Sequence, residues 1–146
     1  MKVLYSYKQT VKTLVVLLNL CFFISCAEKI TPLTDVDLAK ELLAGTLNTT
    51  GQQYKIWKID SMTVDNVGQE LSSSQLNYFQ RFEAIGSWSD FDGLNGLWDM
   101  PNQNSINVTI DDETIEYFDV NVLSFMLKMK RVSDGQTLEY FYKIEN

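Results

Sequence analysis

The pattern of apolar and polar residues predicts a chain built mainly from short antiparallel strands. From residue 77 to 100, three apolar runs of strand length are separated by breaks at Gly86 and Asp92-Gly93. No residue set in this stretch recurs at helical spacing, and Asp-Gly tolerates the positive φ that two-residue hairpins need. We therefore expect three antiparallel strands joined by tight turns. Their aromatic residues are Tyr78, Phe79, Phe82, Trp88, Phe91 and Trp98.

Five further strands are predicted around this central block. The clearest alternates Ile106, Val108 and Ile110 with polar neighbours, as a half-buried strand does. Turns are expected at Asp111-Asp112 and at Ser133-Asp134-Gly135. The five predicted ranges are 54–64 (with a bend), 106–110, 113–120, 122–130 and 136–144.

The last two strands have apolar faces that we expect to point inward. In 122–130, Leu123, Phe125, Leu127 and Met129 alternate with polar residues that include Lys128. In 136–144, every second residue from position 138 onward is apolar or aromatic, namely Leu138, Tyr140, Tyr142 and Ile144. This alternation is typical of a sheet with one buried face.

One short helix is predicted before the strands, from Asp35 to Ala44. Thr34 and Asp37 have the spacing of a capping box, and Gly45 stands at the position where glycine commonly ends a helix. Val36, Leu38 and the leucines at 42 and 43 form an apolar stripe at helical spacing. We expect this stripe to cover one end of the core; binding of a partner helix is the alternative.

About eight strands within roughly 90 residues indicate an up-and-down sheet. An open meander of that size would expose two long edges, whereas a barrel removes them. Residues 34–146 are therefore predicted to form an all-β, up-and-down antiparallel β-barrel of about eight short strands with one short N-terminal helix.

Residues 1–25 have the layout of a secretory signal peptide. A basic start precedes an apolar run from Leu14 to Ile24, which is shorter than the about 20 apolar residues that a membrane span requires. Phe23-Ile24-Ser25-Cys26 resembles a bacterial lipobox, which implies lipidation of Cys26 and a membrane anchor followed by a tether over residues 26–33. An ordinary signal peptide cleaved nearby is the alternative, and bulky Leu20 makes Cys21 the weaker lipidation candidate.

Composition narrows the possible functions. The formal charge is −7, which argues against nucleic-acid partners and against a basic face for anionic lipid. The chain has no histidine, and both cysteines precede residue 27. The commonest general base, the commonest metal ligand and the thiolate nucleophile are thus missing from the predicted barrel. We expect no metal, no cofactor and no enzymatic activity.

Two acidic clusters have residue spacings that resemble parts of known functional sites. Asp90, Asp92 and Asn95 resemble the start of a calcium loop, but Leu94 and Pro101 occupy ligand positions, so an Asp-rich turn is the better interpretation. The acidic run from Asp111 to Glu113 could imitate a glycosidase pair. Adjacent residues in a turn point to solvent, whereas a working pair must face each other across a cleft.

The assembled pattern resembles the small lipocalin-like lipoproteins of Gram-negative bacteria. The resemblance rests on the lipobox, the short helix, the early strand with Trp57, and the central block. The motifs of that block are Phe79 to Phe82, Gly86-Ser87-Trp88, Asp90-Phe91-Asp92-Gly93 and Gly96-Leu97-Trp98. It implies a barrel anchored in the cell envelope as an outer-membrane lipoprotein, facing the periplasm or the cell surface, and supplies little chemistry.

Two hypotheses follow for the barrel interior, because eight strands enclose either packed side chains or one small ligand. In the first, the protein is a non-catalytic binding module for a small apolar ligand. In the second, the barrel is filled by its side chains and the lipoprotein has a structural role or contacts another envelope protein. The candidate ligand-binding residues, several of which core packing would also explain, are Trp57, Tyr78, Phe82, Trp88, Trp98, Phe125 and Tyr140.

Overall fold

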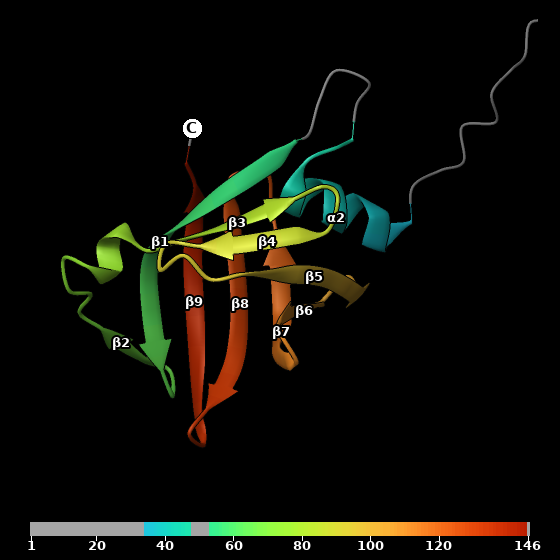
Figure 1. Cartoon of the computed structure of the whole chain (residues 1–146). Helices are drawn as coiled ribbons and strands as arrows, with labels where there is room; N and C mark the ends of the chain where they lie inside the picture. The colour runs from blue at the N-terminus through green and yellow to red at the C-terminus, as the bar shows by residue number, and fades with distance from the viewer. Residues whose placement is uncertain (1–33, 48–52, 146) are drawn as a thin grey trace, which may run out of the picture. The chain divides into compact units, whose positions relative to one another are not determined.

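The computed structural model describes residues 34–47 and 53–145, so Cys26, the leader and the tether lie outside the described residues. The described part contains one α-helix, α2 (Asp35–Ala44), and a short 3-10 helix, η1 (Gln75–Asn77) (Figure 1). Its strands are β1 (Tyr54–Val64), β2 (Val67–Gln69), β3 (Phe79–Glu83), β4 (Ser87–Asp90), β5 (Asn95–Asn102), β6 (Ser105–Ile110), β7 (Glu113–Val122), β8 (Met126–Ser133) and β9 (Gln136–Ile144).

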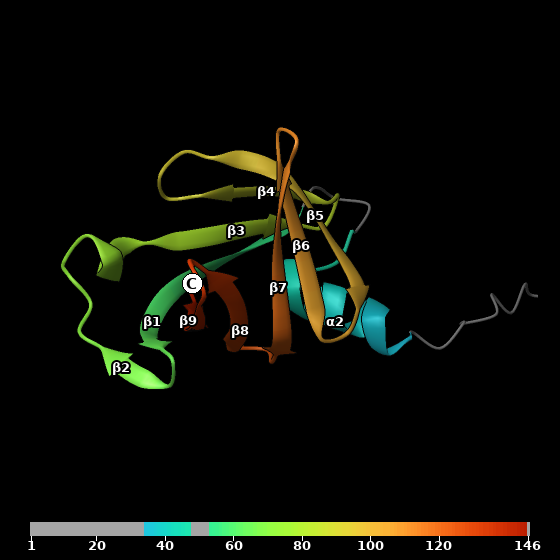
Figure 2. The same ribbon diagram turned by 90° about the horizontal axis from the view of Figure 1, so that it is seen from below.

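Eight of these strands close into an antiparallel barrel. Sequence neighbours pair from β3 through β9, and β1 pairs with both β3 and β9, which closes the sheet. Figure 2 shows β3, β4 and β5 across the interior from β8 and β9. The short β2 pairs only with the end of β1. The prediction of an up-and-down antiparallel β-barrel with one short helix is therefore confirmed.

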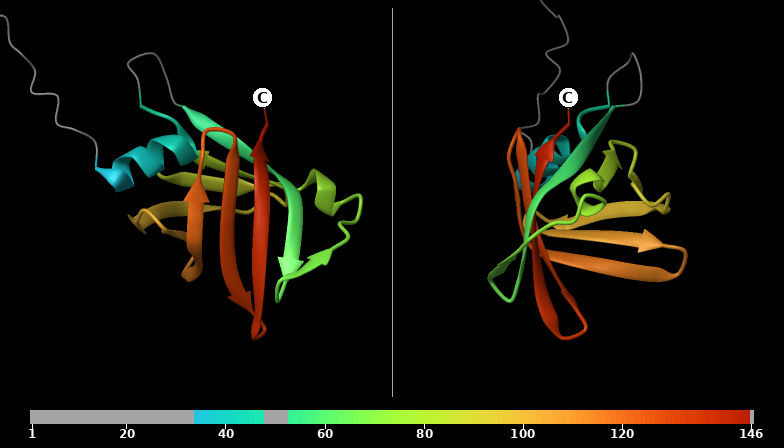
Figure 3. Two further views of the ribbon diagram at one scale, coloured as in Figure 1. Left: turned by 180° about the vertical axis from the view of Figure 1, so that it is seen from behind. Right: turned by 90° about the vertical axis from the view of Figure 1, so that its left-hand side faces the viewer.

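Strand β1 holds the seam of the barrel and bends to do so. Its first half pairs with β3, and the stretch from Trp57 to Val64 pairs with β9 along the other edge (Figure 3, left). A register shift between Ile59 and Ser61 marks a β-bulge. An extra residue changes the alternation of a strand, so Ile59 and Met62 both pack against the core. This bulge causes the bend that the sequence predicts in this strand.

Asp and Gly residues with positive φ make the tight turns. Asp134 (φ 52°) and Gly135 (φ 77°) join β8 to β9, and Asp111 (φ 52°) begins the turn between β6 and β7. These values are those of hairpin turns that need the left-handed region, and both turns were predicted. The turn at Asp65-Asn66, which leads into β2, was not predicted, and neither was η1.

Helix α2 covers one end of the barrel, as predicted. Thr34 and Asp37 form the expected capping box, and the helix ends at Gly45 with φ 86°. Two side chains of β1 then satisfy the last carbonyls of the helix: Trp57 Nε1 donates to Leu43 O at 2.8 Å, and Lys55 Nζ donates to Leu42 O at 2.6 Å. These bonds fix the helix to the barrel and place a cation at its C-terminus.

The interior is packed with large side chains at this helix-covered end. Phe82 and Trp98 meet edge to face with ring centroids 5.7 Å apart, and Trp98 Nε1 donates to Glu83 O at 2.9 Å. The edge-to-face contact of such a pair stabilises the core beyond the contribution of the buried ring area. Other buried residues of this core are Leu43, Trp57, Met100, Ile106, Val108, Val122, Leu127 and Met129.

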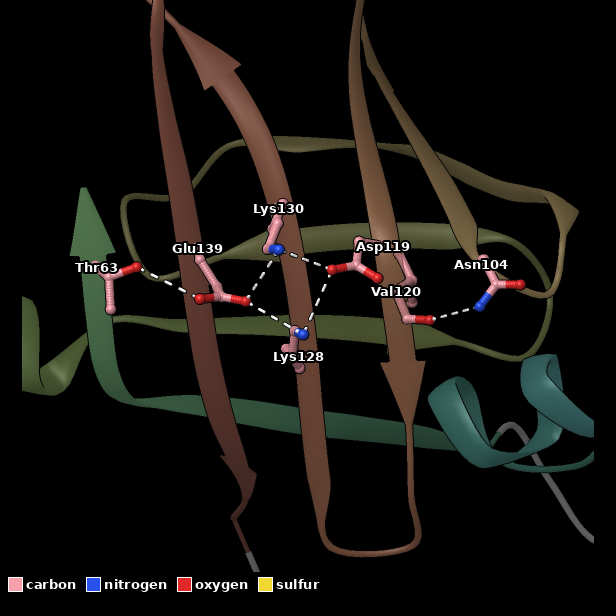
Figure 4. A network of polar contacts seen from close by, with 7 residues as sticks. All are labelled: Thr63, Asn104, Asp119, Val120, Lys128, Lys130 and Glu139. Atoms are coloured by element: carbon pink, nitrogen blue, oxygen red, sulfur yellow. Dashed lines mark hydrogen bonds and ion pairs between the residues drawn. The ribbon is translucent and has the colours of Figure 1, made fainter. Parts of the chain in front are cut away.

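Ion pairs on the outer face join neighbouring strands near the seam. Lys128 and Lys130 of β8 each lie within 3.5 Å of Asp119 on β7 and of Glu139 on β9. Thr63 of β1 donates to Glu139 at 3.5 Å, which extends the network across the seam (Figure 4). Exposed ion pairs contribute little each. Here they link the outward-facing side chains of β7, β8 and β9.

One predicted strand boundary is wrong, and with it the burial of two residues. The structure has a single β7 from Glu113 to Val122, and β8 begins only at Met126. A register shift after Phe118, with Asp119 at φ 49°, changes the alternation of inward and outward side chains. The strand continues past Val120, where we predicted its end. Leu123 and Phe125, which we expected to face inward, lie in the following turn and are 40% and 62% exposed.

A close approach between β5 and β6 requires glycine at position 96. A Cβ there would collide with the carbonyl oxygen of Thr109 on β6. We expect Gly96→Ala to lower the free energy of unfolding by about 1–3 kcal/mol, as overpacking typically does. Urea denaturation measures this. The control is Gly68→Ala on β2, where a Cβ meets nothing within 4 Å, and which should stay within about 0.5 kcal/mol of the parent. Equal losses in both variants would contradict the packing.

Candidate functional site

A pocket of about 440 Å³ lies in the barrel interior near the end opposite α2. Residues of η1 and of the β4–β5 turn border it, and inward-facing side chains of seven strands line it. We call it the open-end pocket. Its lining residues are Ile59, Met62, Ser74, Gln75, Tyr78, Gln80, Trp88, Asp90, Phe91, Asp92, Leu94, Ile110, Ile115, Tyr117, Arg131, Tyr140 and Tyr142.

A buried hydrogen-bond network around Gln80 forms the floor of this pocket. Gln80 is 1% exposed; its Oε1 accepts from Trp88 Nε1 at 3.0 Å, and its Nε2 donates to the Tyr142 hydroxyl at 3.0 Å. Buried polar groups are stable only when they are paired. This network holds Trp88 and Tyr142 in place between the packed end and the pocket.

Asp90 binds the β4–β5 turn to the wall of the pocket. It is 7% exposed, and its two carboxylate oxygens accept from the Tyr78 hydroxyl at 3.1 Å and from the Leu94 amide at 3.0 Å. The predicted Asp-rich turn, in which the side chain caps a backbone amide, is thus confirmed. Within residues 34–47 and 53–145, no group of three or more acidic, Cys or His residues is arranged to hold a metal ion.

The hydroxyls of Tyr78, Tyr117 and Tyr142 in the pocket remain neutral. Burial, followed by the neighbouring Asp90 carboxylate, raises the pKa of Tyr78. Burial also raises the pKa of Tyr117, and it raises that of Tyr142 well above the usual value. An unperturbed tyrosine already titrates near pH 10, so these three hydroxyls keep their protons at neutral pH. They offer hydrogen bonds without adding charge.

Apolar side chains supply much of the remaining wall. Ile59, Met62, Ile110 and Ile115 line the pocket from three different strands. Phe91 lies at its border and meets Phe79 edge to face, with centroids 5.8 Å apart. An apolar wall with a few fixed polar groups is the usual composition of a small-molecule site. The arrangement can enclose an apolar body and orient one polar end.

The structure divides the seven candidate ligand-binding residues into three groups. Tyr78, Trp88 and Tyr140 line the open-end pocket. The second group, Trp57, Phe82 and Trp98, lies in the packed core under α2 and does not line the pocket. Phe125 is exposed in the β7–β8 turn, so its expected place in the core is wrong.

Sequence reasoning missed the polar groups of the pocket, above all Gln80 and Arg131. Each has a signal in the strand alternation. Gln80 precedes the inward Phe82 by two residues, and Arg131 follows the inward Leu127 and Met129 at the same spacing. The side-chain period of a strand places such residues on the same face. A polar residue in an otherwise apolar inward series would have identified both.

The Gln80 network makes a prediction about stability. In Gln80→Met, Trp88 Nε1 and the Tyr142 hydroxyl lose their partner inside the barrel, at a cost of about 1–3 kcal/mol for each group left unpaired. Urea denaturation should show that loss, whereas Gln103→Met, at an exposed turn position, should stay within about 0.5 kcal/mol of the parent. A Gln80→Met variant as stable as the control would mean that water replaces the missing bonds.

Within the described residues, no helix is both long and apolar enough to cross a membrane. Comparison with known proteins found no match to a family model, to a curated protein or to a solved structure. The closed barrel and the chemistry of the open-end pocket are therefore the features that bear on function.

Proposed function

We propose that this protein is a non-catalytic binding module that holds one small, largely apolar molecule in the open-end pocket. The observation that carries the proposal is a cavity of about 440 Å³ in a closed eight-stranded barrel, lined mainly by apolar and aromatic side chains. Ligand pockets usually have volumes of about 300–1,000 Å³. A barrel of eight strands has room for one such molecule.

The distribution of packing supports this function over that of a structural lipoprotein with a filled barrel. A filled barrel would have packed side chains at both ends, whereas here the large core side chains concentrate under α2 and the open-end pocket, lined from seven strands, occupies the interior at the opposite end. The packed end keeps the barrel stable, and the hydrogen-bonded floor keeps the pocket walls in place. A preformed pocket binds with a smaller entropy loss than one that must be ordered by its ligand.

We also propose that the module is attached to the outer membrane through lipid on Cys26. The support is the sequence before the barrel: a basic start, an apolar run too short to span a bilayer, and the lipobox-like Phe23-Ile24-Ser25-Cys26. Burial of acyl chains is worth about 0.8 kcal/mol per methylene, so several chains give a stable anchor. An anchored carrier would meet apolar molecules at the membrane where they are concentrated.

Dye binding tests the pocket. The neutral probe N-phenyl-1-naphthylamine should bind saturably to the full-length protein with an increase in fluorescence. Met62→Trp places a large ring in the cavity and should weaken binding by at least about ten-fold, a loss of about 1.4 kcal/mol. The control is Val67→Trp, which adds the same ring on β2 at an exposed position outside the pocket lining. Equal affinities for the two variants would place the dye elsewhere, and the absence of saturable binding to the parent would contradict the function.

Metabolic labelling tests the anchor. In a Gram-negative host, the full-length protein should incorporate labelled palmitate and sediment with the membranes. Cys26→Ala should remove the label and release the protein into the soluble fraction, because it removes the thiol proposed to carry the lipid. Cys21→Ala is the matched control and should remain labelled. Label that persists in Cys26→Ala and disappears in Cys21→Ala would assign the lipid to the other cysteine.

A further inference from the structure

Arg131 places a positive charge in the wall of the open-end pocket. It is the third residue of an inward series on β8 that begins with Leu127 and Met129, both 0% exposed. Arg131 itself is half-buried and lines the pocket. Placing a guanidinium in such a position carries a desolvation cost that a counter-charge normally offsets. A guanidinium at this position therefore needs a partner, normally one of opposite charge.

Within the described residues, Arg131 has aromatic and hydroxyl neighbours and no carboxylate in an ion pair. Its guanidinium lies 5.7 Å from the centre of the Tyr140 ring, within the range of a cation–π contact. Its Nε is buried without a hydrogen-bond partner. By contrast, Lys128 and Lys130 on the outer face of the same strand each contact two carboxylates. The inward cation of β8 is thus the one left with unused hydrogen-bonding capacity.

Two acidic residues line the same pocket: Asp92 is exposed in the β4–β5 turn, and the buried Asp90 is already engaged. Both oxygens of Asp90 accept hydrogen bonds, from Tyr78 and from the Leu94 amide. Within the described residues, neither carboxylate forms an ion pair with Arg131.

We infer that the pocket takes an amphipathic carboxylic acid, with its apolar body against the isoleucine and methionine walls and its carboxylate bound by Arg131. The inference rests on the proposed function and adds the chemical class of the ligand. A guanidinium matches a carboxylate through two parallel hydrogen bonds. The hydroxyls of Tyr140 and Tyr117, which lie next to Arg131, are donors available to the same group. The carboxylate of the ligand supplies the counter-charge that Arg131 lacks within the described residues.

The test compares two probes that share an apolar chain and differ in the head group. Decanoate and decanol are titrated calorimetrically at pH 7.4 into the full-length protein. We expect the parent to bind decanoate at least about ten-fold more tightly than decanol, because hydrogen bonds to charged groups are stronger than neutral ones. In Arg131→Gln, the affinity for decanoate should fall by about ten-fold or more, and the affinity for decanol should change by less than about two-fold.

Two further variants separate charge from geometry and from general destabilisation. Arg131→Lys keeps the charge without the fork of donors and should have an intermediate affinity for decanoate. Arg81→Gln removes the other arginine of the chain, which stacks on Tyr54 at 3.8 Å, pairs with Glu83 and does not line the pocket; it should leave both affinities unchanged. Thermal unfolding of each variant confirms that the protein measured is folded.

The outcomes distinguish this inference from the function on which it rests. Binding of both probes with equal affinity, or an equal loss of both in Arg131→Gln, would overturn the carboxylate assignment and leave the apolar binding module intact. Tighter binding of decylamine than of decanoate would overturn it too, because Asp90 would then set the preference. A parent protein that binds neither probe nor the neutral dye would contradict the binding function and the inference together.

Discussion

The pairing of β1 with β9 is the interaction on which the rest of the structure depends. Without it, the sheet from β1 through β3 to β9 would stay open, and the edges of β1 and β9 that now pair with each other would be exposed. The pairing extends from Trp57 to Val64 and requires the bulge between Ile59 and Ser61. Closure creates an interior in the first place, and the bulge decides that Ile59 and Met62 both contribute to it.

The interior that closure creates is unequal at its two ends. Under α2, the hydrogen bonds from Trp57 and Lys55 hold the helix against the barrel, and the Phe82–Trp98 pair fills the space. Toward the other end, the inward positions change from large apolar residues to Gln80, tyrosines and Arg131. The packed end supplies stability through burial. The other end can then carry a cavity whose cost the first end offsets.

The polar groups of the pocket have separate tasks. Gln80 fixes Trp88 and Tyr142, and Asp90 fixes Tyr78 and the β4–β5 turn, so both are occupied by the protein's own donors and acceptors. Tyr78, Tyr117 and Tyr142 stay protonated because burial raises their pKa values. Arg131 lines the same pocket without a carboxylate partner among the described residues, and its buried Nε has no hydrogen bond. That asymmetry points to an acidic ligand more directly than the pocket's volume does.

Local patterns in the sequence determined most of the fold, because caps, turns and strands depend on neighbours. The helix from Asp35 to Ala44, the turn at Asp134-Gly135 and the eight barrel strands all followed from such signals. Tertiary structure decided what depends on register: the bulge at Asp119 lengthened β7 and moved Phe125 into a turn. It also decided which inward aromatics pack and which line a cavity. Trp57 and Trp88 both lie in short apolar runs of the sequence. Only their positions along the barrel axis decide that Trp57 packs in the core and Trp88 lines the pocket.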